Sequence, residues 1–331
     1  MRRKLPSFVI VVLVALATAG VAAAANGGFT PVQPASPNST HTQTAYYVIL
    51  GFTSAIFVLV EVLLVLFVVK YRRRGRPREV EGAQVHGHTR LEMIWTVIPV
   101  LILAVIAAVV FLELPSIDKA PAAGDPIHIT VEGHQYYWQF DYVDSPTHAR
   151  SIGTLHVPVG QVVDLKVVSP DVIHSWWVPA LGGKIQAIPG RINHFWFRAD
   201  KAGSYVGQCA ELCGVYHASM RAVVLAESQQ QYQHFVTKYA PETIGRQEWN
   251  GVCATCHGNL GQGGYGPDIA SNALLKQMKG LEQILRNGFT GSLGAMPPVG
   301  KTWTNGQIAA LVRYATKHIY NASPAGATGG G

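Results

Sequence analysis

Two long apolar runs, separated by a basic loop, limit what this chain can fold into more than any other feature. The runs cover residues 46–69 and 91–114, and each is long enough to cross the hydrocarbon core of a membrane as a helix. The loop between them is rich in Lys and Arg over residues 70–76, and such loops stay on the cytoplasmic side. We therefore predict a two-helix transmembrane hairpin, with everything after about Asp118 outside the cytoplasm.

The N-terminus has the pattern of an export signal. Basic residues at 2–4 precede an apolar run at 8–16 and small residues at 22–25, which is typical of a secretory signal peptide. We predict a signal peptide at residues 1–25, with an uncleaved membrane helix as the alternative. Residues 26–118 then hold a polar linker and the hairpin.

The composition agrees with a membrane protein and argues against a nucleic-acid partner. The chain is 48% hydrophobic and only 14% charged. Its net charge of +7 arises at residues 2–4 and 70–90, and the other residues together are close to neutral. Membrane topology explains this distribution of basic residues.

Two carboxylates lie in or beside the apolar runs. Glu61 is inside the first run, where a carboxylate is either functional or paired with a neighbouring helix. Glu92 lies at the cytoplasmic end of the second run, and from its position alone it is an interfacial carboxylate.

Residues 119–228 have a different texture, with short β-rich segments. These segments lie at 127–131, 137–140, 155–157, 162–168, 194–197 and 220–225. Alternating apolar residues with Gly and Pro turns at this spacing predict an antiparallel sandwich or barrel.

One loop of this region gathers soft metal ligands. It carries Cys209, Cys213, His217 and Met220, and His174 lies upstream at the end of an expected strand. Thiolate, imidazole and thioether together suit copper, and two thiolates can bridge two copper ions. A local disulfide and structural zinc are the alternatives, but both leave His174 and Met220 without a role.

A second motif predicts a covalently bound haem. Cys253 and Cys256 with His257 form the C-x-x-C-H attachment signal for a c-type haem. Met296 lies downstream in a Met-Pro-Pro segment and supplies a thioether for the far side of the iron. Met278 competes for that role, but its amphipathic surroundings favour a core position. A redox dithiol and half of a zinc site are the alternatives.

The remaining boundaries follow from composition. Residues 229–244 are polar and are assigned as a linker, although a helix is also compatible with them. Residues 245–321 form the haem domain, closed by an expected helix over 305–320. The Gly-rich tail at 322–331 is predicted to be disordered.

Taken in order, these motifs resemble subunit II of the respiratory haem-copper (cytochrome c) oxidases, with a cytochrome c domain fused at the C-terminus. Besides the cysteine loop, the resemblance rests on segments 133–138, 174–179 and 188–191, which occur in the order and spacing of that family. It implies a cupredoxin-like Greek-key sandwich at 119–228 and an all-α cytochrome c domain at 245–321.

The resemblance also implies roles for individual residues. The family's binuclear copper centre, CuA, would be held by His174, Cys209, Cys213, His217, Met220 and the backbone carbonyl of Glu211. The side chain of Glu211 matches one that reaches a magnesium ion at the border with the catalytic subunit. Glu92 matches a carboxylate at the mouth of a proton-uptake path.

In the haem domain the resemblance implies thioether bonds to Cys253 and Cys256 and iron ligation by His257 and Met296. The carbonyl of Pro267 would orient the proximal imidazole.

The implied function is electron input to a terminal oxidase in the bacterial cell (inner) membrane. Electrons would pass from a reduced carrier, such as cytochrome c, through haem and copper to catalytic subunit I, assembled with subunit III. Oxygen reduction and proton translocation would occur on the partner and not on this chain. A nitric oxide reductase subunit with the same copper site and a membrane-anchored redox shuttle are the alternatives.

Two positions depart from the family pattern. Tyr136 stands where an electron-entry Trp is usual, and Gln186 replaces a common Asp. A tethered haem gives a reason. If electrons arrive from an internal donor, the surface that docks free cytochrome c is not needed for electron entry, and its residues can change.

Overall fold

The computed structural model describes residues 32–72, 86–122, 124–238, 242–291 and 294–321. The predicted signal peptide, most of the basic loop and the predicted tail lie outside these residues. Within them, Thr40–Lys119 form one compact unit, and the other described residues form a second unit.

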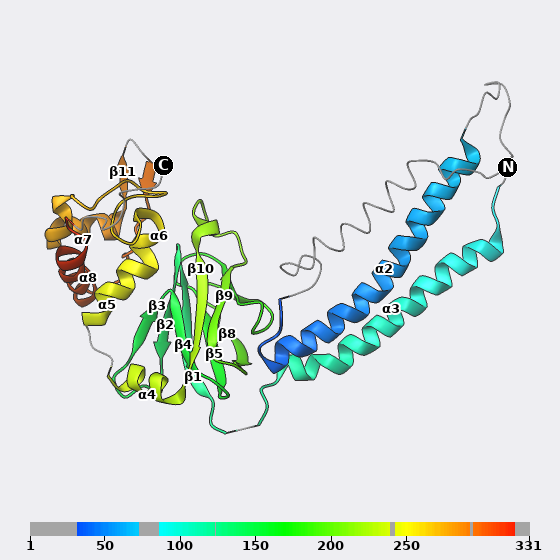
Figure 1. Ribbon diagram of the computed structural model, residues 1–331, viewed down its shortest axis with the longest axis horizontal. Coiled ribbons are helices and arrows are strands. Elements are labelled where there is room, and N and C mark those ends of the chain that lie inside the picture. The colour runs from blue at the N-terminus through cyan, green and yellow to red at the C-terminus, as the bar shows by residue number, and fades with distance from the viewer. Residues whose placement is uncertain (1–31, 73–85, 123, 239–241, 292–293, 322–331) are drawn as a thin grey trace, which may run out of the picture. The chain divides into compact units, whose positions relative to one another are not determined.

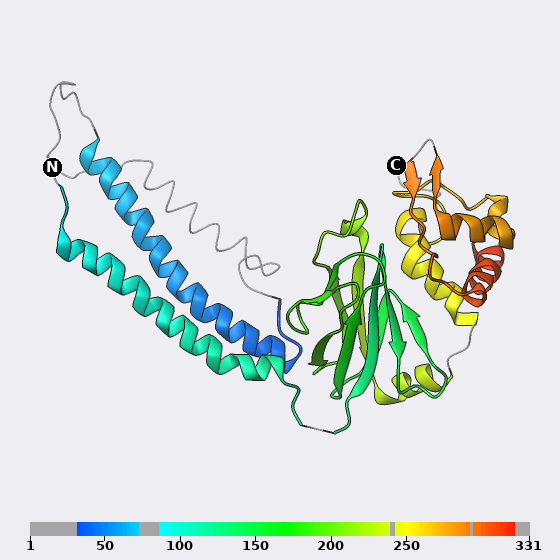
Figure 2. The ribbon, with the colours of Figure 1, turned by 180° about the vertical axis from the view of Figure 1, so that it is seen from behind.

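The first unit is a pair of long helices, α2 (Pro37–Tyr71) and α3 (Thr89–Asp118), which lie side by side (Figures 1 and 2). Both are apolar enough and long enough to cross a membrane, which confirms the predicted hairpin. The helices extend beyond the apolar runs because polar residues at their ends continue the helical hydrogen bonding. His41 Nδ1 and Glu113 Oε2 lie 2.6 Å apart and join the two helices.

The second unit begins with a β-sandwich of two five-stranded sheets. The first sheet has the order β3-β2-β1-β5-β8, and the second has the order β4-β10-β9-β6-β7. The strands of the first sheet are β1 Ile127–His134, β2 Tyr137–Tyr142, β3 Arg150–Ile152, β5 Val162–Val168 and β8 Asn193–Arg198. Those of the second are β4 Thr154–Pro158, β6 His174–Trp177, β7 Ile185–Ala187, β9 Gly203–Cys209 and β10 Arg221–Glu227.

The sandwich is not purely antiparallel. β1 pairs with β5 in parallel, and β10 pairs with β4 in parallel, while the other strand pairs run antiparallel. Alternation of apolar residues specifies which face of a strand is buried but not the direction of its neighbour. These two pairings therefore differ from the sequence-based expectation.

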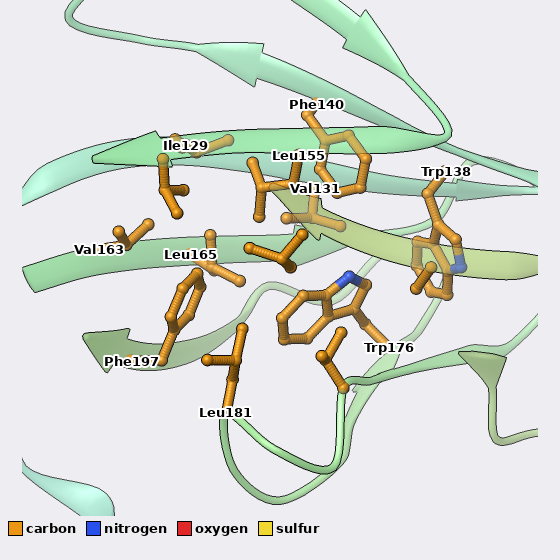
Figure 3. Packing of buried hydrophobic residues seen from close by; sticks show 14 of the residues in the cluster. Ile129, Val131, Trp138, Phe140, Leu155, Val163, Leu165, Trp176, Leu181 and Phe197 are labelled. Carbon is orange, nitrogen blue, oxygen red and sulfur yellow. The ribbon is translucent and has the colours of Figure 1, made fainter. Parts of the chain in front are cut away.

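The core lies between the two sheets. Trp138 and Leu165 from the first sheet and Trp176 from the second are fully buried there (Figure 3). Inward-facing side chains of this size make the sandwich rigid, because close-packed interiors resist deformation. A loop at the end of the sandwich is thus held on a firm base.

Helix α4 (Gln229–Thr237) follows β10 and lies in the stretch assigned as a linker. Ser228 and Gln231 form a capping box at its start, which satisfies free N–H groups of the first turn. Tyr232 and Val236 are buried against the sandwich core. Their four-residue spacing places both on one face of the helix, and this explains why a polar segment folds here.

The haem-motif domain is mainly helical. Its elements are α5 Glu242–Glu248, the π-helical turn η2 Trp249–Cys253, α6 Ala254–His257, the 3₁₀ turn η3 Ala273–Lys276, α7 Met278–Asn287, β11 Phe289–Gly291, β12 Gly294–Met296 and α8 Asn305–His318. Trp249, Leu285, Ile308 and Leu311 are buried at its centre. The hairpin of β11 and β12 is the one departure from an all-α fold in the described part of this domain.

The small domain packs directly on the first sheet. Trp303 Nε1 donates a hydrogen bond of 2.8 Å to the Tyr137 hydroxyl, which in turn donates to the Val299 carbonyl at 3.4 Å. Nearby, Gly251 approaches β3 so closely that an added Cβ would lie 2.9 Å from the Ile152 carbonyl oxygen. The two domains therefore share a specific contact.

Candidate functional site

The pairing of β9 with β10 closes the cysteine loop at its base. Cys209 is the last residue of β9, and Met220 lies directly before β10. The Cys209 N–H donates a 2.9 Å hydrogen bond to the Met220 carbonyl. The ends of the loop are therefore joined by backbone contacts, and the side chains at both ends face the same space.

His174 reaches this loop from the neighbouring strand. It begins β6, whose residue Trp176 pairs with Cys209, so the expectation that it ends a strand was wrong. The turn at residues 169–171 separates β6 from β5, so the strand that contains His174 runs forward to Trp176 and Trp177. Gly133 makes room for the imidazole, because an added Cβ would lie 2.9 Å from the His174 ring.

The structure brings all the predicted donor atoms together. Cys209 Sγ lies 3.9 Å from His174 Nδ1 and 3.2 Å from the Glu211 carbonyl oxygen. Cys213 Sγ lies 3.4 Å from His217 Nδ1 and 3.9 Å from Met220 Sδ. The ligand atoms of His174, Cys209 and Cys213 all lie within 4.8 Å of one another. Two sulfur atoms thus sit at the centre, and the other four donors surround them.

Asp171 is a residue of this site that the sequence reasoning missed. Its Oδ1 lies 2.8 Å from His174 Nε2, so Nε2–H donates to the carboxylate and Nδ1 is left facing Cys209. A hydrogen-bond acceptor for the second ring nitrogen fixes the tautomer and orientation of a ligating imidazole. The signal in the sequence was an Asp three residues before the His.

Gln135 is a second residue of this site to which the sequence analysis gave no role of its own. Its backbone N–H donates to Asp171 Oδ2 at 2.7 Å, and its side-chain amide donates to the Cys213 carbonyl at 2.5 Å. One residue therefore ties the carboxylate that orients His174 to the loop that carries the second thiolate.

The two thiols have different electrostatic environments. Burial raises the pKa of Cys209, but hydrogen bonding with His174 and backbone groups outweighs it, so the net pKa is lowered. Burial, together with the charge of Cys209, raises the pKa of Cys213 to about 12. Burial opposes the charged form of His174, yet its hydrogen bond to Asp171 leaves its pKa raised overall. The site therefore favours one thiolate, and a metal cation that binds Cys213 would displace the proton of its thiol into solvent.

Glu211 separates into a backbone role and a side-chain role. Its carbonyl faces Cys209, whereas its side chain accepts a 3.3 Å hydrogen bond from Gln186 Nε2. That carboxylate borders a shallow cavity lined also by Lys184 and Arg191. The side chain thus points away from the sulfur atoms and toward the surface.

Glu92 is far from these groups in sequence and lies in the other unit. It is in the first turn of α3, where its Oε1 accepts a 2.9 Å hydrogen bond from the His88 N–H. The structure therefore gives Glu92 a helix-capping contact.

A large apolar cavity occupies the small domain. Its volume is about 380 Å³, in the range of cofactor pockets. Its lining includes Cys253, Cys256, His257 and Met296, and the rest is mainly aliphatic and aromatic. Met278 is not among the lining residues but packs against the domain core, as the amphipathic pattern indicated.

His257 is oriented as an iron ligand should be. Its Nδ1 donates to the Pro267 carbonyl at 2.9 Å, which leaves Nε2 free to face the cavity. Gly266 allows this arrangement, because an added Cβ would lie 2.8 Å from the imidazole ring. The cavity, the paired cysteines and the oriented imidazole fit a c-type haem.

Comparison with known proteins identifies three segments. Residues 24–113 match the family described as cytochrome c oxidase subunit II, transmembrane domain, and residues 147–227 match its periplasmic domain. Residues 240–314 match the family described as cytochrome c oxidase, cbb3-type, subunit III.

Individual relatives match along most of the chain. Cytochrome c oxidase subunit 2 of Alkalihalophilus pseudofirmus is 33% identical in an alignment 310 residues long, and the match covers 84% of this chain and 88% of the relative. The protein of the same name from Synechocystis is 30% identical in an alignment 285 residues long, and the match covers 72% of this chain and 84% of the relative. The solved periplasmic domain of subunit II of cytochrome oxidase from Bradyrhizobium japonicum is 33% identical, with a TM-score of 0.33, and the match covers 35% of this chain and 94% of that one.

Proposed function

We propose, from the premise that this chain belongs to the cytochrome c oxidase subunit II family, that it carries electrons through a covalent haem c and a binuclear copper centre to a catalytic partner. The chain is the electron-input subunit of a haem-copper oxidase, an oxidoreductase complex. Its two helices span the membrane, and its periplasmic domain lies outside the cytoplasm.

The copper centre is supported by the chemistry of its donor set. His174 and His217 would supply imidazoles, Cys209 and Cys213 would supply thiolates, and Met220 would supply a thioether. The Glu211 carbonyl completes the set. Soft sulfur with imidazole favours copper over zinc. The donors are held on a rigid sandwich, so little rearrangement accompanies a change of charge at the metal.

The haem is supported by the cavity of the small domain. Cys253 and Cys256 would form its thioether bonds, while His257 and Met296 would hold the iron. His and Met ligation raises the reduction potential into the range of electron carriers. Bound haem and copper supply one-electron chemistry, and the protein holds both in place and excludes water from the apolar cavity.

The proposed roles of Glu211 and Glu92 rest on the surroundings of their carboxylates. Glu211 points to the surface beside Lys184 and Arg191, and we assign it to a magnesium ion shared with the catalytic subunit. We assign Glu92 to the mouth of a proton-uptake path, where its contact with the His88 N–H orders the carboxylate. The partners proposed are catalytic subunit I, subunit III, membrane lipid and a reduced cytochrome c or similar donor.

The predicted boundaries complete the proposal. We propose a signal peptide at 1–25, a linker and hairpin at 26–118 and a copper domain at 119–228. A connecting segment at 229–244, a haem domain at 245–321 and a tail at 322–331 follow.

The observation that carries this function is that one chain holds both the six-donor cluster around Cys209 and Cys213 and the haem cavity. A membrane-anchored shuttle would have the same sites but no oxidase partner. A nitric oxide reductase subunit would have them and a partner that does not consume oxygen.

The test is purification of the complex from native membranes, followed by optical and paramagnetic resonance spectra and oxygen uptake. We expect a binuclear copper signal, a c-type haem and co-purification with a haem-copper subunit. Cys209→Ser should abolish the copper signal, and Cys253→Ser combined with Cys256→Ser should abolish the covalent haem. Ser219→Ala and Thr255→Ala, in the same two motifs, should keep both. A mononuclear copper signal, or copper unchanged in Cys209→Ser, would contradict the proposal.

A further inference from the structure

Tyr216 belongs to the copper loop but reaches the haem domain. It is the residue before His217, and its ring lines the haem cavity. Its hydroxyl donates a 3.1 Å hydrogen bond to the carbonyl oxygen of Ala295, the residue before Met296. A single side chain and one hydrogen bond therefore connect a proposed copper ligand with a proposed iron ligand.

The Tyr216 ring is held from its other side by the sandwich. The ring of Tyr136 meets it edge to face, with centroids 5.4 Å apart and planes at 84°. Tyr136 is in turn packed over Gly214, where an added Cβ would lie 2.4 Å from the Tyr136 hydroxyl. Aromatic pairs of this geometry are stabilising, so Tyr216 is fixed in the orientation that points it into the cavity.

A small cavity of about 40 Å³ lies where the two sites approach each other. Tyr136, Tyr216, Cys256, His257 and Met296 border this cavity. The haem domain is anchored beside it by the hydrogen bond from Trp303 to Tyr137. The contact at Tyr216 is thus part of a larger interface and does not depend on one hydrogen bond for its existence.

We propose that Tyr216 is the positioning residue that couples the haem site to the copper site, an inference that rests on the proposed function. With both groups bound, one electron would pass from the haem site to the copper site, so that the haem would be oxidised and the copper reduced by one electron. No bond forms or breaks, and Tyr216 keeps its proton and its electrons. Its ring provides continuous contact from the haem cavity to the backbone of His217, and its hydroxyl holds the Met296 segment against the copper loop.

The experiment compares three variants in the purified oxidase complex. Tyr216→Phe keeps the ring and removes the hydroxyl, and Tyr216→Leu removes the ring as well. Tyr205→Phe is the matched control. The Tyr205 hydroxyl donates a hydrogen bond to the nearby Lys201 carbonyl, and Tyr205 is not among the residues that line the haem cavity. The haem is photoreduced by a laser flash, and electron transfer to copper is followed from their separate optical bands.

A second measurement does not depend on electron transfer. Hydrogen exchange at the amides of residues 294–296 is measured in the full chain in detergent, because that segment carries the acceptor of the Tyr216 hydroxyl. We expect faster exchange in both Tyr216 variants and no change in Tyr205→Phe.

For Tyr216→Phe we expect transfer to slow about fivefold, the population change that accompanies loss of one hydrogen bond. Tyr216→Leu should slow it further, with the copper and haem spectra retained. Unchanged transfer and unchanged exchange in Tyr216→Leu, with both spectra present, would overturn the inference alone. A wild-type chain without one of the two spectra would overturn the proposed function and this inference with it.

Discussion

Replacement of Asp171 by Asn tests whether the copper site depends on a residue outside its ligand set. The carboxylate accepts hydrogen bonds from His174 Nε2 at 2.8 Å and from the Gln135 N–H at 2.7 Å. The amide of Asn is neutral and has one acceptor oxygen, so one of these bonds is lost and the other is weakened.

The magnitude follows from these two bonds. A hydrogen bond to a charged group contributes about 1.5–3 kcal/mol and a neutral one about 0.5–1.5 kcal/mol. The substitution therefore removes roughly 2 kcal/mol of the free energy that holds the His174 imidazole in its orientation. Since about 1.4 kcal/mol corresponds to a factor of ten, copper affinity should fall roughly 10- to 100-fold, which is also the usual effect of losing an outer partner of a ligating His.

The assay is a competition titration of the full chain in detergent against a copper chelator, with the copper spectrum as the readout. Asp144→Asn is the matched control, because Asp144 makes a similar contact to His128 Nδ1 at 3.1 Å on an exposed surface. We expect the control to bind copper like the wild type. An affinity and spectrum unchanged in Asp171→Asn would refute the argument that the carboxylate orients His174.

Three further outcomes follow from the haem domain and its interface. Burial raises the pKa of Glu248 from 4.5 to about 9. Between these two pH values the Glu248 carboxyl is protonated in the folded chain and ionised in the unfolded chain. Its contribution to the stability of the fold therefore declines as the pH rises from 4.5 to 9. Glu248→Gln should therefore gain Tm relative to wild type across that range, and a constant difference in calorimetry would contradict this. Trp303→Phe removes the donor to Tyr137 and should lower the free energy of unfolding by about 1 kcal/mol in denaturant titrations, whereas no loss would show that the bond is not formed. Gly251→Ala places a Cβ 2.9 Å from the Ile152 carbonyl and should loosen the contact of the haem domain with β3, which limited proteolysis of the full chain would detect as faster cleavage. An unchanged digestion pattern would count against the close approach.

Much of the architecture could be predicted because its signals are local. The hairpin follows from hydropathy, and the donor set around Cys209 follows from residue types whose chemistry suits copper. The C-x-x-C-H motif likewise needs no tertiary information, since the motif itself carries the attachment chemistry. The fold supports Met296 over Met278, because Met296 lines the cavity and Met278 packs against the domain core.

What sequence reasoning missed depends on contacts between distant segments. Asp171 and Gln135 have ordinary local surroundings, and only the fold brings them together against His174. The parallel pairing of β4 with β10 joins strands that are far apart in the chain, and no alternation pattern encodes it. Helix α4 is polar overall, and its role appears only when Tyr232 meets the sandwich core.

The start of β2 has a consequence for how such chains arise. Gln135 contacts the copper loop, while Tyr137 two residues later contacts the haem domain, and the copper donors themselves take no ligand from that domain. A gene fusion that adds a haem module, or a deletion that removes it, would therefore alter surface positions around Tyr137 and Ile152 and the contact of Tyr216 with Ala295. Descendants on either side of such an event would inherit the same copper donors, with the difference between them confined to one face of the first sheet and to Tyr216 in the copper loop.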